Sequence, residues 1–188
     1  MLDITICDIK TERPLNNNFR GKIMVLRDVG MMSVTPKRYT NFEEFDKDSS
    51  CLADYVLNNT KELSDAQKIS YARNVYAPNI LNGYIIIGSL TKDIQKFLEC
   101  STCNLKFSID NMIKNKLAHP EVTFDDYKKI PEIIKNPSKY YKSKSGYDVI
   151  LFKEDEKYYK LVIKTTKNRK ENFIKSLHLL NVDRYRKY

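Results

Sequence analysis

The two histidines of this 188-residue chain are its strongest candidates for proton transfer. His119 directly precedes Pro120, at the expected end of a helix, where an imidazole is partly exposed. Free imidazole has a pKa of about 6.5 and exchanges protons readily at neutral pH. A lone histidine in such a place is more often a capping or surface residue, so that alternative stays open.

Alternating residues in the C-terminal part predict a second chemical feature, a polar sheet face. In residues 160–166 the alternation places Leu161 and Ile163 toward the core. The opposite face then carries Lys160, Val162, Lys164 and Thr166. A lysine and a hydroxyl group on one face can bind a phosphate, because the ammonium neutralises charge while the hydroxyl donates a hydrogen bond.

The next expected strand carries the second histidine. Alternation there places Ile174, Ser176 and His178 on one face, with Lys175 on the other. If the open faces of the two strands coincide, Ser176 and His178 join Lys164 and Thr166 in one cluster. An ordinary solvated sheet face is the alternative.

The charge is concentrated near these residues. The chain has 33 Lys and Arg against 24 Asp and Glu, a net charge of +9. Residues 1–134 are electrically balanced, whereas residues 135–188 carry 15 basic and 6 acidic side chains together with seven tyrosines. This concentration favours a polyanionic partner, in particular nucleic acid, over a lysine-rich surface that only aids solubility.

The elements that position these residues change in character along the chain. Residues 22–29 predict a strand, and capping patterns at 40–43 and 64–67 predict helices, with a further helical stretch at 52–58. The helix that begins at the 64–67 pattern should stop before Pro78. Residues 1–80 therefore form a mixed, mostly helical segment of unknown role.

Helical and strand signals alternate in the middle of the chain. Short strands are expected at 84–88 and 105–108. Helices should begin at Ser89 or Thr91, at Ser108, at Thr123 and at Pro131.

Three strands joined by hairpins are expected after Gly146, at 147–152, 157–165 and 172–180. The fold class is therefore α+β, a helical part followed by a small antiparallel sheet. We divide the chain into residues 1–80 and a second domain of residues 81–188.

Other classes of protein are disfavoured. No apolar run approaches the length of a membrane span, and residues 1–4 do not resemble the start of a secretory signal. Cys100 and Cys103 have the spacing of a metal or redox pair, but a second pair of ligands is missing. We therefore expect no metal and no cofactor.

Residues 84–188 resemble the phage-type nuclease domain of the barnase, EndoU, colicin and RelE-like (BECR) superfamily. The resemblance rests on Ser176 and on the runs YIIIGSL at 84–90, NKLAHPE at 115–121, DDY at 125–127, IPEIIKNP at 130–137 and YYKLVIKTT at 158–166. It implies a BECR-like RNase fold, in which helices precede a small sheet whose exposed face binds RNA.

The resemblance also implies a reaction and a set of residues. Active members of the superfamily cut RNA without metal, with the ribose 2′-OH as nucleophile. The catalytic residues carried over are His119, Lys164, Thr165 or Thr166, and Ser176. Beside them, the residues expected to bind RNA are Lys160, Lys175, His178 and Arg169. A base, a cation and hydroxyl groups that hold a nonbridging oxygen are the roles that the reaction requires.

The leading hypothesis is an endoribonuclease, a phage-encoded toxin-like effector that acts on tRNA or another structured RNA. The alternative is a non-catalytic module that binds nucleic acid or protein in phage assembly or host takeover. Expected partners are RNA and an inhibitor or a phage structural protein, without a membrane. The expected location is the host cytoplasm or the virion.

Overall fold

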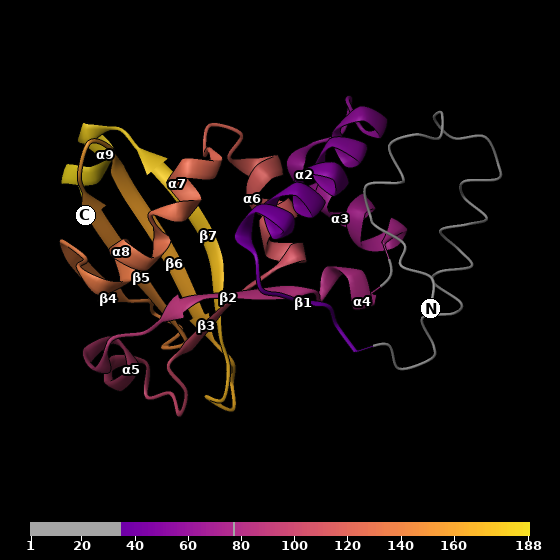
Figure 1. Cartoon of the computed structure of the whole chain (residues 1–188). Coiled ribbons are helices and arrows are strands. Elements are labelled where there is room, and N and C mark those ends of the chain that lie inside the picture. Colours follow the sequence, from indigo (N-terminus) through magenta and orange to yellow (C-terminus); the bar gives the residue numbers. More distant parts are fainter. Residues whose placement is uncertain (1–34, 77) are drawn as a thin grey trace.

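The computed structural model describes residues 35–76 and 78–188 (Figure 1). The strand expected at 22–29 lies outside these residues. The described part combines helices with one seven-stranded sheet, so the expected α+β class is confirmed. None of its helices has both the length and the hydrophobicity that crossing a bilayer requires.

The sheet is larger than expected and is not purely antiparallel. Its strand order is β1-β2-β3-β7-β6-β5-β4, and the pairs β1–β2 and β3–β7 are parallel. The small antiparallel sheet that alternation predicted is therefore only one part of it. The strands are β1 Arg38–Tyr39, β2 Tyr84–Ser89, β3 Asn104–Ser108, β4 Lys139–Lys142, β5 Asp148–Glu154, β6 Tyr158–Thr165 and β7 Asn172–Leu180.

Four of the eight described helices begin at the predicted capping residues. Ser64 forms a capping box, and the side chains of Thr91, Ser108 and Thr123 each accept a hydrogen bond from a backbone N–H in the first turn of their helix. The helices are α2 Phe42–Asn59, α3 Asp65–Val75, α4 Pro78–Leu81, α5 Lys92–Leu98, α6 Ile109–Ala118, α7 Phe124–Lys128, α8 Ile130–Lys135 and α9 Val182–Arg186.

Helix α2 departs from the prediction. It is one continuous helix of 18 residues rather than two stretches, and Asn41 caps it instead of Thr40. Its buried apolar side chains, Phe45 and Leu52 among them, belong to one apolar cluster that also contains Ile113 and Leu177. Residues on both sides of position 80 thus contribute to one core, and the division into two domains stays a prediction.

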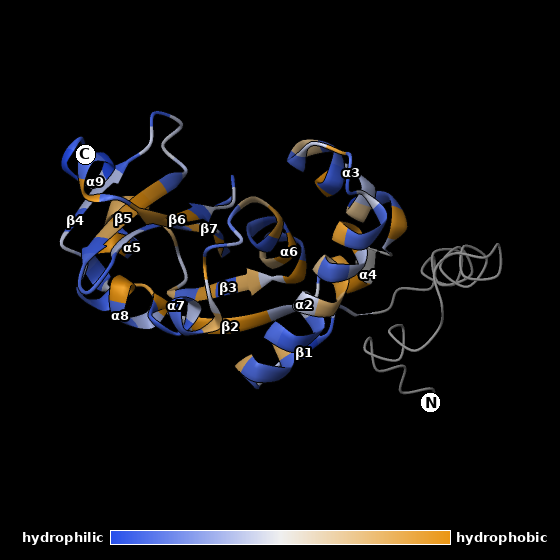
Figure 2. Cartoon of the chain, turned by 90° about the horizontal axis from the view of Figure 1, so that it is seen from above, coloured by the Kyte–Doolittle hydropathy of each residue, from blue (hydrophilic) through white to orange (hydrophobic). Residues whose placement is uncertain are grey.

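The predicted meander β5–β6–β7 is confirmed, and its two faces differ. Leu161 and Ile163 of β6 are fully buried on the face that we call the covered face. Helices α5 and α8 contact the strands of the meander, and α8 and α9 lie on opposite sides of it (Figure 2). The face with Lys160, Val162 and Lys164 is here called the open face.

Candidate functional site

A β-bulge at Lys175 decides which residues of β7 lie on the open face. Ile163 pairs with Ile174, whereas Val162 pairs with Ser176, so Lys175 is the extra residue. Ile174 is fully buried on the covered face. The prediction that Ile174 shares a face with Ser176 and His178 is therefore wrong, because simple alternation does not anticipate a bulge.

The same bulge makes the open faces of β6 and β7 coincide. Ser176 lies opposite Val162, and His178 lies opposite Lys160. Residues that face each other in a ladder share a side of the sheet. The cluster expected from the sequence thus forms in part, through a feature that the sequence pattern did not show.

Two histidines from distant elements meet on this face. The ring centroids of His119 and His178 are 4.0 Å apart in an edge-to-face arrangement. The Nε2 atom of His178 is 2.8 Å from the hydroxyl oxygen of Ser176, and Nδ1 of His119 is 3.4 Å from a carboxylate oxygen of Glu121. We call Glu121, His119, His178 and Ser176 the histidine cluster.

The environment of His178 keeps its imidazole neutral. Burial, followed by the nearby charges of His119, Lys160 and Lys114, lowers the pKa of His178 to about 4. At neutral pH the ring therefore has one N–H donor and one acceptor nitrogen.

A buried asparagine joins the two elements that carry the histidines, helix α6 and strand β7. Beyond its short pairing with β3, strand β7 exposes backbone groups at its edge, and Asn115 of α6 binds those of Leu177. The Asn115 amide accepts from the Leu177 N–H at 2.8 Å and donates to its carbonyl at 3.0 Å, and it also donates to the Tyr127 hydroxyl. His119 is one helical turn after Asn115, and His178 directly follows Leu177, so this contact places the two rings together.

A cationic pocket lies next to the histidine cluster along β7. It has a volume of about 350 Å³. Within the described part of the chain, Lys114 and Lys164 form no ion pair, while Lys175 lies 3.4 Å from a carboxylate oxygen of Asp148. We call it the lysine pocket, and its lining residues are Asn111, Lys114, Lys164, Thr165, Thr166, Phe173 and Lys175.

Lys164 and His119 belong to neighbouring parts of the open face. Lys164 pairs with Phe173, whereas the residue opposite His178 is Lys160. Four residues of strand separate Lys160 from Lys164, a backbone distance of about 13 Å. The structure therefore brings His119 to Ser176 and His178, and Lys164 to Lys175 and Thr166.

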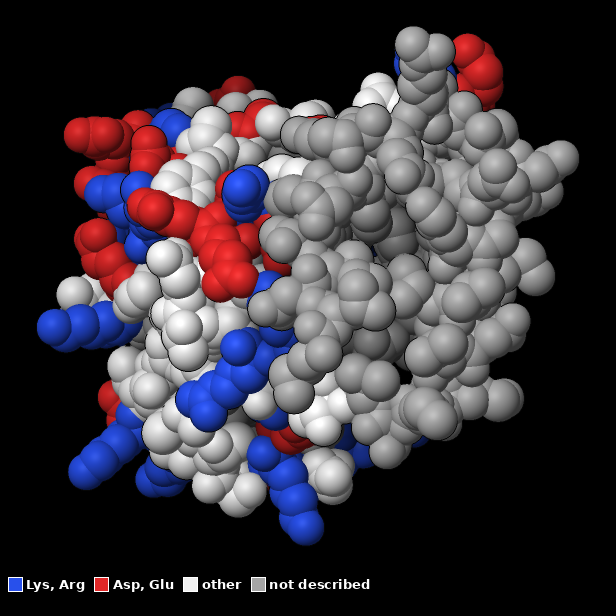
Figure 3. Space-filling model, turned by 45° about the vertical axis from the view of Figure 1, so that its right-hand side comes forward, with Lys and Arg blue, Asp and Glu red and all other residues white. Residues whose placement is uncertain are grey.

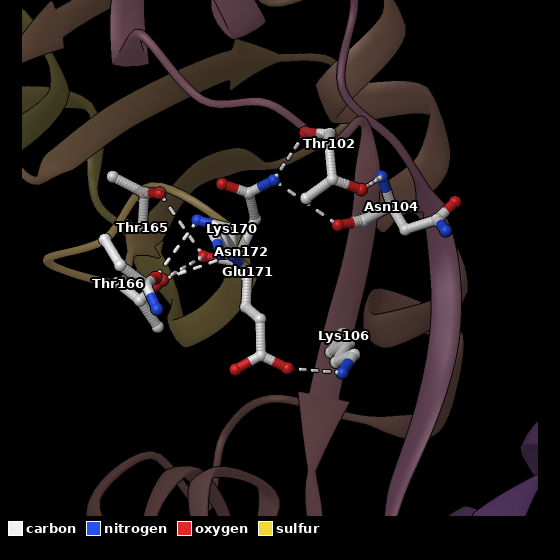
Figure 4. A network of polar contacts seen from close by, with 9 residues as sticks. Thr102, Asn104, Lys106, Thr165, Thr166, Lys170, Glu171 and Asn172 are labelled. Atoms are coloured by element: carbon white, nitrogen blue, oxygen red, sulfur yellow. Dashed lines mark hydrogen bonds and ion pairs between the residues drawn. The ribbon is translucent and has the colours of Figure 1, made fainter.

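The two threonines are engaged in the β6–β7 hairpin. Thr165 is fully buried on the covered face and donates to the carbonyl of Glu171. The hydroxyl of Thr166 accepts from the Glu171 N–H and lies 2.6 Å from the side-chain oxygen of Asn168 (Figure 4). The Thr165 side chain is therefore engaged within the protein, and the catalytic role carried over to it stays a prediction.

The side chain of Arg169 also makes contacts within the protein, close to the β6–β7 hairpin. Its guanidinium donates to the carbonyls of Leu98 and Gly146 and lies 4.8 Å from the ring centroid of Tyr147. Asn172 adds hydrogen bonds to the carbonyls of Thr102 and Asn104 (Figure 4). These contacts join the hairpin to the segment between α5 and β3 and so fix the end of the lysine pocket.

Sequence reasoning missed four contributors on or after α6. Asn111, Lys114 and Asn115 lie at helical spacing on the side of α6 that leads to His119, and Glu121 follows that histidine. The available signal was a polar Asn115 among the apolar residues of an amphipathic helix, which predicts a buried polar contact.

The charge is unevenly distributed over the described surface. On the side shown in Figure 3, most acidic side chains gather in the upper part and basic ones in the lower part. Across the described ranges, no group of three or more His, Cys, Asp and Glu is arranged to hold a metal ion. Neither a family model, nor a curated protein, nor a solved structure matches this chain, so the candidate site rests on its own geometry.

Proposed function

We propose that the chain is a metal-independent endoribonuclease that cleaves RNA by attack of the ribose 2′-OH on the adjacent phosphate. The observation that carries the proposal is the contact of His119 and His178, 4.0 Å between ring centroids, on an open sheet face lined by lysines. A proton acceptor, hydrogen-bond donors and cations beside one another are the groups that this reaction requires.

In the proposed reaction, His119 removes the proton of the 2′-OH from its Nε2 side, while Glu121 at Nδ1 orients the ring. The 2′-oxygen then bonds to phosphorus, and the bond from phosphorus to the 5′-oxygen breaks. The ammonium of Lys160, opposite His178, protonates that leaving oxygen. The products are a 2′,3′-cyclic phosphate and a 5′-OH end.

Ser176 and His178 hold the phosphate in this scheme. If the neutral His178 donates from Nε2 to the Ser176 oxygen, the hydroxyl proton of Ser176 is free to donate to a nonbridging oxygen. Lys114 and Lys164 in the lysine pocket bind a neighbouring phosphate of the same strand. Lys164 thus moves from the catalytic role to substrate binding.

The resemblance to BECR nucleases supports the same proposal. The meander β5–β6–β7 after a helical part agrees with the small antiparallel RNase sheet that the resemblance implies. The further strands β1 to β3 extend that sheet at the β7 side.

The test is RNA cleavage by the purified chain in EDTA, with the ends of the products identified by mass spectrometry. We expect 2′,3′-cyclic phosphate ends, and a loss of about 10²- to 10⁴-fold in His119→Gln, since a positioned acid or base contributes that much. Lys128→Ala on α7 is the matched control, because Lys128 lies outside both clusters. RNA with a 2′-deoxyribose at the cleaved position should stay intact.

Undiminished cleavage in His119→Gln contradicts the assignment of the base. Absence of cleavage of every RNA offered, with wild-type protein in excess, contradicts the proposed activity as a whole.

A non-catalytic RNA-binding module is the second candidate. It is favoured by Tyr141 and Tyr188, which are 44% and 47% exposed, and by Lys160, whose ammonium lies 4.7 Å from the Tyr188 ring centroid. Exposed aromatic rings beside cations bind single strands by stacking, whether or not they cleave them. RNA binding without turnover, unchanged by His119→Gln, would establish this candidate instead.

A further inference from the structure

A second and larger pocket, of about 630 Å³, adjoins the lysine pocket. Asn111 and Phe173 line both pockets, so these two residues form the wall between them. A volume in this range holds a small organic ligand, and the shared wall lets one ligand reach into both pockets.

The larger pocket continues the open face of the sheet. Phe173 pairs with Lys164 on one side and with Lys106 of β3 on the other, so the three side chains share a face. Tyr84 of β2 lies two residues along on the same face, where it pairs with Ser108. The two pockets are therefore successive hollows on one surface.

The charged residues of the larger pocket neutralise one another. Arg73 donates two hydrogen bonds to the Asp110 carboxylate, at 2.9 and 2.8 Å, and the Lys106 ammonium lies 2.6 Å from Glu171 (Figure 4). The lysine pocket, in contrast, contains two lysines that form no ion pair with described residues. The larger pocket therefore suits an uncharged group, and the lysine pocket suits an anion.

Aromatic and amide groups characterise the larger pocket. The Lys106 ammonium lies 4.6 Å from the ring centroid of Tyr84 and 5.9 Å from that of Phe173, so the two rings flank it. The side-chain amides of Asn82 and Asn111 form no hydrogen bond with other described residues. Flat apolar rings with free amides on the rim are the groups that bind a planar, polar-edged ring such as a nucleobase.

We propose that the larger pocket binds the base and ribose of one nucleotide, whose phosphate occupies the lysine pocket on the other side of Phe173. This inference rests on the proposed function, of which it defines a substrate subsite. The base packs against Phe173 and Tyr84, and Asn82 and Asn111 bind its polar edge. Lys114 and Lys164 bind the phosphate.

The test is calorimetric binding of the four ribonucleoside 5′-monophosphates, each compared with ribose 5-phosphate and with inorganic phosphate. We expect at least one nucleotide to bind roughly tenfold or more tightly than ribose 5-phosphate, since stacking on an aromatic side chain contributes about 1–3 kcal/mol per base. Phe173→Leu should abolish that difference and, because both lysines remain, weaken the binding of inorganic phosphate far less than Lys164→Ala does. Lys164→Ala should weaken the binding of all these compounds.

Tyr140→Ala is the control, because Tyr140 is an exposed aromatic residue that lines neither pocket. Binding of inorganic phosphate by Phe173→Leu also reports that the variant is folded. Where that binding is lost, Asn82→Ala takes its place, since Asn82 lies on the rim and its loss leaves the core intact.

Nucleotides that all bind no more tightly than ribose 5-phosphate overturn the subsite. So does a nucleotide preference that survives both Phe173→Leu and Asn82→Ala. A clear nucleotide preference without RNA cleavage in EDTA would instead remove the proposed nuclease activity and leave the pocket assignment standing.

Discussion

Two polar clusters of this molecule use similar side chains in opposite ways. The carboxylate of Asp126 in α7 is nearly inaccessible, with 2% of the side chain exposed. It accepts hydrogen bonds from the Lys157 ammonium at 2.7 Å, the Tyr159 hydroxyl at 2.9 Å, and the backbone and hydroxyl of Thr123. Both carboxylate oxygens of Asp126 thus accept hydrogen bonds from groups of the protein itself.

The histidine cluster is open by comparison. Among the described residues, the His178 side chain has one hydrogen bond, to Ser176, and Nδ1 of His119 lies at a long 3.4 Å from Glu121. Neutral imidazole and hydroxyl groups have further donors and acceptors to offer. A saturated cluster stabilises the fold, whereas an unsaturated one beside lysines that form no ion pair with described residues can bind a substrate.

The largest effect on stability is expected from Asn115→Ala. The substitution leaves the backbone of Leu177 and the hydroxyl of Tyr127 without their partner in the core, so we expect the free energy of unfolding to fall by about 3 kcal/mol. RNA cleavage should fall as well, because His119 loses its support. Urea unfolding gives the stability, and Asn111→Ala, on the same helix but with no side-chain hydrogen bond to described residues, should change it by about 0.5 kcal/mol or less.

A smaller, pH-dependent effect is expected from Asp126→Asn. Although burial opposes it, the hydrogen bonds from Lys157, Thr123 and Tyr159 lower the pKa of Asp126 from its usual value to about 2. A carboxylate with a depressed pKa contributes stability above its unfolded pKa of about 4, and that contribution is lost as the pH falls toward 2.

Urea unfolding should therefore show a loss of about 2 kcal/mol for Asp126→Asn at pH 7, which shrinks below about pH 4. Asp125→Asn is the matched control, since Asp125 precedes Asp126 in the chain and its own side chain is 86% exposed. A difference from wild type that stays constant between pH 7 and pH 3 would disagree with this account of the cluster.

The open face should respond to charge removal by a change in binding rather than in stability. For Lys114→Ala combined with Lys164→Ala, we expect RNA affinity to fall by about tenfold. The negative slope of log K against log salt should become shallower by about 2, because each lysine releases about one counterion. Fluorescence anisotropy with labelled RNA measures both. An unchanged salt slope would remove these two lysines from the interface, and Lys128→Ala combined with Lys129→Ala is the control pair.

The smallest effect concerns the titration of His178. Because burial is the main cause of its lowered pKa and the charge of His119 only the next, His119→Gln should raise the pKa of His178 from about 4 by less than about one unit. The imidazole C2 proton, followed by NMR against pH, reports this value. A return to about 6.5 would show that the charge of His119, and not burial, dominates.

The local elements were predictable where short-range signals are strong. Ser64, Thr91, Ser108 and Thr123 cap helices as expected, because a capping side chain acts on N–H groups within its own first turn. The three strands of the meander also lie within one or two residues of their predicted ranges. Strand β4 was not predicted, because its four residues, Lys-Tyr-Tyr-Lys, show no clear alternation of polar and apolar side chains.

The candidate site was predictable only in part. Lys164, Thr166, Ser176 and His178 were expected in one cluster. Ser176 and His178 do lie on the open face, whereas Lys164 and Thr166 line the neighbouring lysine pocket. Thr165, expected at the site, lines the lysine pocket but is fully buried. The second pocket needs residues from β2, β3, β7 and α6, whose proximity no local pattern expresses.

Residue order alone thus determined four helix caps, the alternation of the C-terminal strands and the basic excess after residue 134, because each depends on neighbours within a few positions. The tertiary fold decided the parallel pairing of β3 with β7, the bulge at Lys175 and the meeting of His119 with His178. The pairing of β3 with β7 and the contact of the two histidines join segments about 60 residues apart. Their free energy comes from burying both partners at once, which no short stretch of chain contains.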